Sequence, residues 1–213
     1  MSLLNDDSSY KLLPSDPTKS QNSCIEKTLK RLAGKKLISG ILANSLKQDE
    51  PTIAKTYGLP KVHKIGIPLR LVVFLIGAPN YKVYKWLVHQ LNTLTKNSEY
   101  FIENSKTFLD KLKGIKVSTD EVMASSDVVS LGTSMPLALA RGSTEELLQA
   151  YTTDVPADAL LQLLDLCLET SLSFSELCQQ KLKWTPMGSP ISGFLVEAAM
   201  QKSESIPLST TET

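Results

Sequence analysis

The feature that most constrains this chain is a basic stretch punctuated by Pro and Gly, which reads YGLPKVHK over residues 57–64 and is followed by PLR at 68–70. Pro60 and Pro68 restrict the backbone, so the stretch holds three permanent cations on a turn-rich scaffold: Lys61, Lys64 and Arg70. The guanidinium fork of an arginine matches the geometry of phosphate oxygens. The stretch is therefore suited to a polyphosphate.

The basic character extends on both sides of this stretch. Residues 51–98 contain seven Lys or Arg and no Asp or Glu, whereas residues 120–213 contain thirteen acids and four bases. The formal net charge of +1 therefore hides a local charge of +7 followed by one of −9. A one-sided basic region is typical of a nucleic-acid or nucleotide surface, while a solvated basic face remains the alternative.

Length and composition bound the class of protein. With 213 residues, 42% of them hydrophobic and 21% charged, the chain is expected to be globular, with one large domain or two small ones. The N-terminus carries acids where a signal peptide needs bases, and no apolar run approaches the roughly 20 residues that span a bilayer. We expect a soluble, unprocessed, intracellular protein with no membrane partner, in either the nucleus or the cytoplasm.

The three cysteines, Cys24, Cys167 and Cys178, are odd in number and lack the spacing of metal ligands. They indicate neither a disulfide framework, nor a disulfide-linked partner, nor a zinc site. We expect them to be buried small apolar side chains in a reducing compartment.

Hydrophobic periodicity and capping signals predict six helices. The first is expected over 23–38, because Ser23 and Glu26 have the spacing of a capping box. The others are a helix with an apolar stripe from Val83 to Leu94 and outward-facing Lys82 and Lys85, a short helix after Ser105 that ends at Gly114, two helices opened by Pro136 and Pro156, and one through Phe194–Met200.

Two strands are predicted. The apolar run 71–76 is expected to be buried on both faces, and the segment 122–126 is expected to deliver Asp127 near its end. Residues 174–182 form a further extended stretch, and residues 185–190 form a rigid Pro/Gly loop before the last helix. The fold class is α/β in the broad sense (α+β), and helix-rich.

Three blocks now stand in order: YGLPKVHK with PLR at 57–70, SDVVSLGTSMP at 126–136 and TPMGSPISG at 185–193. On these blocks the chain resembles the reverse transcriptase domain of Penelope-like retroelements, with similarity from about residue 3 to residue 201. The resemblance implies a partial right-hand polymerase with fingers and an incomplete palm. It divides the chain into an N-terminal helical segment (1–50), a basic fingers-like region (51–118), a partial palm (119–202) and a disordered tail (203–213).

The implied function is that of a fragment of a retrotransposon's RNA-directed DNA polymerase, which uses an RNA template, a DNA primer, deoxynucleoside triphosphates and Mg²⁺ in a two-metal nucleotidyl transfer. By this resemblance Lys61, Lys64 and Arg70 hold the triphosphate. The resemblance makes Asp127 the catalytic carboxylate and a magnesium ligand, with the backbone carbonyl of Val128 as a second ligand. It assigns three further residues to the nucleotide site: Gly132, Met187 and Gly188, the last allowing close backbone approach.

The sequence also departs from that family. Two metal ions about 4 Å apart need several convergent carboxylates, and the family's later motif of adjacent aspartates is absent from this sequence. Gly132 stands where the family has an aromatic wall against the ribose 2′-hydroxyl. We therefore expect a truncated chain without polymerase activity of its own. The alternatives are a non-catalytic nucleic-acid-binding remnant that uses the basic 51–98 surface, and a poorly folded product with no function. Without the resemblance, Asp127 is read as a turn or cap residue.

Overall fold

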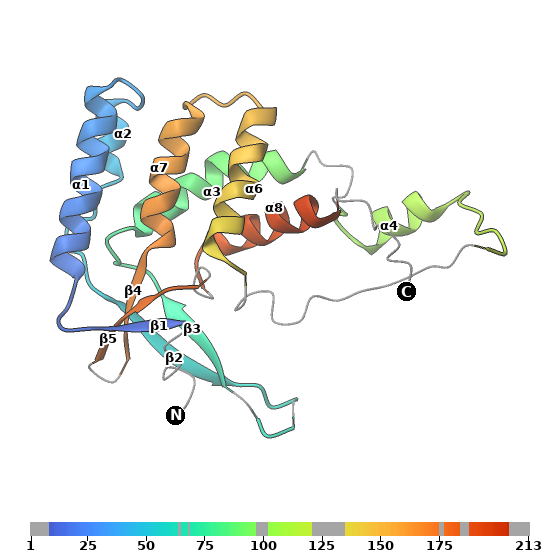
Figure 1. Ribbon diagram of the computed structural model, residues 1–213, viewed down its shortest axis with the longest axis horizontal. Helices are drawn as coiled ribbons and strands as arrows, with labels where there is room; N and C mark the ends of the chain where they lie inside the picture. The colour runs from blue at the N-terminus through green and yellow to red at the C-terminus, as the bar shows by residue number, and fades with distance from the viewer. Residues whose placement is uncertain are drawn as a thin grey trace.

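The structure is a computed structural model, and it describes residues 9–63, 65–67, 69–96, 102–120, 135–174, 177–183 and 188–204. In the view of Figure 1 a layer of helices lies above a single five-stranded sheet. In the described residues the strands are β1 (Tyr10–Leu13), β2 (Ala54–Pro60), β3 (Leu69–Phe74), β4 (Thr170–Phe174) and β5 (Leu177–Lys181). The helices are α1 (Thr18–Gly34), α2 (Gly40–Ser45), α3 (Tyr81–Lys96), α4 (Ser105–Leu112), α6 (Leu137–Ala150), α7 (Ala157–Leu168) and α8 (Ser192–Glu204).

The sheet joins segments that lie far apart in the sequence. Its order is β1-β5-β4-β2-β3, and the pairs are antiparallel except for β2 and β4, which run parallel. The strands come from three of the four segments into which the sequence was divided. The mixed α and β class is confirmed, with five strands in the described residues where the sequence predicted two and an uncertain extended stretch.

The core lies where the helices meet. Helix α7 contacts α1, α3 and α6, and α8 contacts α3 and α6. Each of these helices contributes fully buried aliphatic side chains, as an apolar stripe on a core-facing helix should. Those of α1, α3 and α7 include Ile25, Leu29, Leu32, Leu87, Leu91, Leu160, Leu163 and Leu164. None of the helices in the described ranges combines the length and apolar character needed to cross a membrane.

The predicted bounds of the first helix are wrong, although its apolar stripe is right. The helix begins at Thr18, whose backbone N–H donates to Asp16 Oδ1 at 2.8 Å, and the capping box at Ser23 does not form. The carboxylate of Glu26 accepts a hydrogen bond from Asn22 within the helix instead. The chain leaves the helix after Gly34, where Lys36 adopts a left-handed φ of 58° and the Leu37 N–H donates to the Leu32 carbonyl at 3.0 Å, as in a Schellman motif.

The later helices follow the predicted punctuation. Pro136 and Pro156 directly precede α6 and α7, and Gly114, with φ of 86°, follows the end of α4. In α3 the Lys85 side chain is exposed, while Lys82 is half-buried and forms an ion pair with Asp49 at 3.1 Å. Figure 1 shows α4 standing apart from the other helices.

The predicted burial of the strand at 71–76 on both faces is wrong. Strand β3 lies at the edge of the sheet, and of its six residues only Val73 is buried. The run is apolar, yet the helices cover little of it, so Leu69 and Phe74 remain exposed to solvent. The predicted strand at 122–126 and most of the predicted tail lie outside the described residues.

The expectation for the cysteines holds only in part. All three are free thiols, and Cys167 is buried, but Cys178 is half-buried and Cys24 is exposed. Cys24 lies on the outward side of α1 because Ile25, Leu29 and Leu32 occupy the inward stripe.

Candidate nucleic-acid interface

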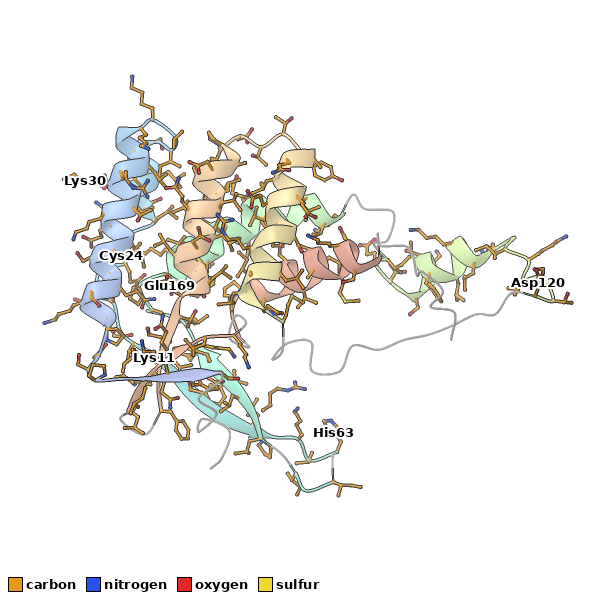
Figure 2. The ribbon with its side chains drawn as sticks, viewed as in Figure 1. Lys11, Cys24, Lys30, His63, Asp120 and Glu169 are labelled. Carbon is orange, nitrogen blue, oxygen red and sulfur yellow. The ribbon has the colours of Figure 1, made fainter. Side chains whose placement is uncertain are left out.

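The basic stretch folds into a β-hairpin. Strands β2 and β3 pair antiparallel from Lys55 opposite Phe74 to Pro60 opposite Leu69, and residues 61–68 connect them. Pro60 closes the paired part of β2, which suits a residue with no N–H to donate. The hairpin extends beyond the helical layer, and His63 marks its far end (Figure 2).

One face of this hairpin carries both cations and aromatic rings. The register places Lys55 opposite Phe74, Tyr57 opposite Val72 and Leu59 opposite Arg70. Alternation along each strand puts all six side chains on the same side of the sheet. We call these residues the hairpin face: Lys55, Tyr57, Leu59, Arg70, Val72 and Phe74.

The hairpin face is open to solvent. Tyr57 and Phe74 are 47% and 48% exposed, and the side chains of Lys55 and Arg70 are exposed as well. Exposed aromatic rings beside cations form the kind of surface on which unpaired bases stack while their phosphates are neutralised. The aromatic residues were missed in the sequence analysis, and only the register of β2 against β3 brings them onto one face.

The structure places two of the three predicted phosphate-binding cations on this hairpin. Lys61 follows β2 directly and is half-buried, and Arg70 is the second residue of β3. Within the described ranges neither side chain forms an ion pair with a carboxylate, so both charges remain open to a ligand. Lys64 lies outside the described residues.

The loop that precedes α8 approaches the hairpin at Gly188. This glycine has φ of 103°, and a Cβ built on it would lie 2.5 Å from the Val73 carbonyl oxygen of β3. Contacts that short do not occur for real Cβ atoms, so only glycine fits here. The backbone that approaches Gly188 here is that of strand β3, whereas the predicted approach was to a nucleotide. A role in nucleotide binding stays a prediction.

The core contains a hydrogen-bond network centred on the Tyr84 hydroxyl. The Tyr84 hydroxyl of α3 is fully buried, and it hydrogen-bonds with the Cys167 carbonyl and, at 2.8 Å, with the Thr170 hydroxyl. Burial raises the pKa of Tyr84 far above its ordinary value. The ring therefore stays neutral and joins α3 to the junction of α7 with β4. No local pattern indicated this role beyond the place of Tyr84 beside the apolar stripe of its helix.

A buried lysine also escaped the sequence analysis. Lys181 ends β5 opposite Tyr10 and Thr170, and its ammonium group lies 5.5 Å from the centroid of the Tyr10 ring. Burial lowers the pKa of Lys181 to about 8. This cation belongs to the interior of the sheet, in contrast to the cations of the hairpin.

The predicted catalytic residues lie outside the described part of the chain. This holds for Asp127, Val128, Gly132 and Met187, so their roles stay predictions. Among the described residues no three His, Cys, Asp or Glu side chains come together as a metal site. The predicted ligands Asp127 and Val128 lie outside these residues, so the magnesium ion stays a prediction.

Comparison with known proteins adds no assignment. No protein-family model matches the chain, and a search of curated proteins returns no match.

Proposed function

We propose that this chain is a reverse-transcriptase-like fingers and palm region, similar to that of Penelope-like retroelements, and that its hairpin binds the phosphates and bases of nucleic acid. The observation that carries the proposal is the hairpin face, which combines exposed cations with exposed aromatic rings. Phosphate contacts supply affinity without sequence preference, and stacked rings favour unpaired bases.

The close approach of Gly188 to Val73 supports the likeness to a polymerase. It brings the block at 185–193 against strand β3, in which the block at 57–70 ends, although more than a hundred residues separate Gly188 from Val73 in the sequence. The resemblance sets both blocks beside the incoming nucleotide, so their meeting is what a shared nucleotide site requires.

Salt dependence of RNA binding tests the proposal. The probe is a fluorescent single-stranded RNA of about 20 nucleotides, titrated by anisotropy between low and moderate salt. The variant Lys61→Ala with Arg70→Ala should weaken binding and flatten the salt slope by roughly one unit for each phosphate that the protein no longer neutralises. The matched control removes two exposed cations elsewhere, Lys106→Ala with Lys116→Ala, and should bind nearly as the parent chain does. No measurable RNA binding at low salt would end the proposal.

Nucleotidyl transfer is the second candidate, favoured by the same contact between the loop at Gly188 and the strand that carries Arg70. Its test is primer extension on an RNA template with Mg²⁺ and deoxynucleotides. Templated extension that disappears in Asp127→Asn supports polymerase chemistry in this chain. RNA binding without extension supports the binding function alone.

A further inference from the structure

Helix α1 has two faces of opposite character. Its inner face packs Ile25, Leu29 and Leu32 into the core, with at most 1% of each residue exposed. At about 100° per residue, the opposite arc of the helix holds four exposed cations, and two more follow its last turn. We call this set the α1 basic stripe: Lys19, Lys27, Lys30, Arg31, Lys35 and Lys36.

The stripe is not neutralised by its surroundings. The single acid of α1 is Glu26, and its Oε1 accepts a hydrogen bond from Asn22 at 2.8 Å instead of pairing with Lys30 one turn later. In the described ranges no ion pair involves a residue of the stripe. Some cations elsewhere are paired: Arg141, for example, forms ion pairs with Asp165 at 2.8 Å and with Glu145 at 3.0 Å. The positive charge of α1 is thus left available.

The length of the stripe suits a row of phosphates. From Lys19 to Lys35 the helix rises by roughly 24 Å at 1.5 Å per residue, a span over which a duplex presents several phosphates of one strand. Figure 2 shows Lys30 extending from α1 away from the neighbouring helices. We propose that the α1 basic stripe binds the phosphate backbone of double-stranded nucleic acid, as a surface separate from the hairpin face.

Other anionic partners fit this surface less well. A helix that lies on an acidic membrane inserts large apolar side chains, but the exposed large hydrophobic residues of the described chain include none from α1. A single strand is held by stacking, but α1 contains no Phe, Tyr or Trp. A row of cations on a helix that exposes no aromatic or large apolar side chain matches backbone contact with a duplex, which needs neither.

The placement of α1 keeps the two surfaces distinct. In Figure 1, α1 forms one end of the helical layer, and the connection between β2 and β3 points away from it at the other side of the sheet. A duplex on α1 and a single strand on the hairpin face would therefore contact different parts of the molecule. Substitutions at one surface should leave the nucleic-acid affinity of the other surface unchanged.

The test compares a fluorescent blunt 20-base-pair RNA duplex with a single strand of the same sequence, both titrated by anisotropy with the full chain. Lys27→Ala with Lys30→Ala and Arg31→Ala should weaken duplex binding by roughly tenfold or more at low salt and lower the salt slope by up to about 2.7. Single-strand binding should change little. The matched control, Lys106→Ala with Lys113→Ala and Lys116→Ala, removes the same charge from α4 and the residues after it. It should keep the parent chain's affinity for duplex.

Several outcomes would overturn the proposal. They are equal duplex binding by the parent chain and the α1 variant, an equal decrease in the α4 control, or no duplex binding by the parent chain. Flotation with vesicles containing phosphatidylserine gives one more: if the α1 variant loses vesicle binding and keeps duplex binding, the stripe serves a membrane instead. Circular dichroism melting of each variant checks that it is folded. The proposal and the hairpin function fail separately, because the single-strand titration of the Lys61 and Arg70 variant reports on the hairpin alone.

Discussion

Helix α7 and the β2–β3 hairpin differ in how far their apolar side chains are buried. Helix α7 buries Leu160, Leu163, Leu164 and Cys167 completely or almost completely, between α1, α3 and α6. The hairpin leaves Tyr57, Leu59, Leu69 and Phe74 between 45% and 48% exposed. A protein that gained stability from every apolar residue would not leave four such residues in water. The difference indicates that the packed helices hold the fold together, while the hairpin leaves its side chains accessible, as the proposed binding requires.

The largest expected effect is a loss of stability from a substitution in helix α7, and it sharpens this comparison. Leu163→Ala removes a side chain that is 0% exposed and should lower the free energy of unfolding by about 2–5 kcal/mol. The matched change in the hairpin, Leu59→Ala, should stay within about 0.5 kcal/mol, because Leu59 is 48% exposed. Urea unfolding followed by circular dichroism measures both. Equal losses of stability would contradict the division of roles.

The next effect concerns Lys181, a buried cation in contrast to Arg70 on the hairpin. Its pKa is about 8 in the folded chain and 10.5 ordinarily, so between these values the unfolded chain binds a proton that the folded chain does not. The contribution of Lys181 to the free energy of unfolding is therefore lowest below pH 8 and rises as the pH increases from 8 to 10.5. For a shift of this size the total rise is ~3 kcal/mol.

Replacing the lysine tests this linkage. Lys181→Met should be more stable than the parent chain at pH 7, and the difference should shrink as the pH approaches 10, as followed by urea unfolding at each pH. Lys85→Met, at an exposed position of α3, is the control and should show no such convergence. A constant difference for Lys181→Met across this range would mean that the lysine is not buried as described.

The third effect concerns stability at the contact between the loop before α8 and strand β3 of the hairpin. Gly188→Ala would bring a Cβ within 2.5 Å of the Val73 carbonyl at a backbone φ of 103°, and should cost about 1–3 kcal/mol. Gly142→Ala is the matched control, since Gly142 lies in α6 with no heavy atom within 4 Å of the added Cβ. Alanine is the better helix former, so this change should stabilise the chain by up to about 1 kcal/mol. A neutral result at Gly188 would contradict the close approach between the loop and β3.

The sequence predicted the helices better than it predicted the sheet. Periodic leucines and the two prolines before α6 and α7 are local signals, so those elements lie where they were expected. The start of α1 was missed because Asp16 supplies its first-turn hydrogen bond, and the Ser23 to Glu26 spacing was a better match to a familiar pattern. The edge position of β3 depends on strands that are distant in sequence, and no local pattern carries that information.

The residues of the candidate site were likewise predicted only in part. The cations of 57–70 and the glycine of 185–193 stand out in the sequence, because Pro, Gly and Arg are informative residue types. Tyr57 and Phe74 did not, because their shared face exists only once β2 and β3 pair in the observed register. The same limit applies to the α1 basic stripe, whose exposure depends on which arc of the helix meets α2 and α7.

The smallest effect on stability is expected for the two aromatic residues of the hairpin face. Substituting them tests whether these rings serve RNA binding or the stability of the fold. Tyr57→Ala and Phe74→Ala should each change the free energy of unfolding by less than about 0.5 kcal/mol, because both rings are about half exposed. If each ring stacks on a base, each change should weaken binding of a single-stranded RNA by roughly 1–3 kcal/mol while leaving its salt slope unchanged, since the cations that neutralise the phosphates are still present. The control is Ile41→Ala in α2, which removes an 84% exposed side chain away from the hairpin and should alter neither quantity. Unchanged RNA affinity in both aromatic variants would leave the hairpin as a purely electrostatic surface. A large decrease in stability would instead make the rings part of the folded body.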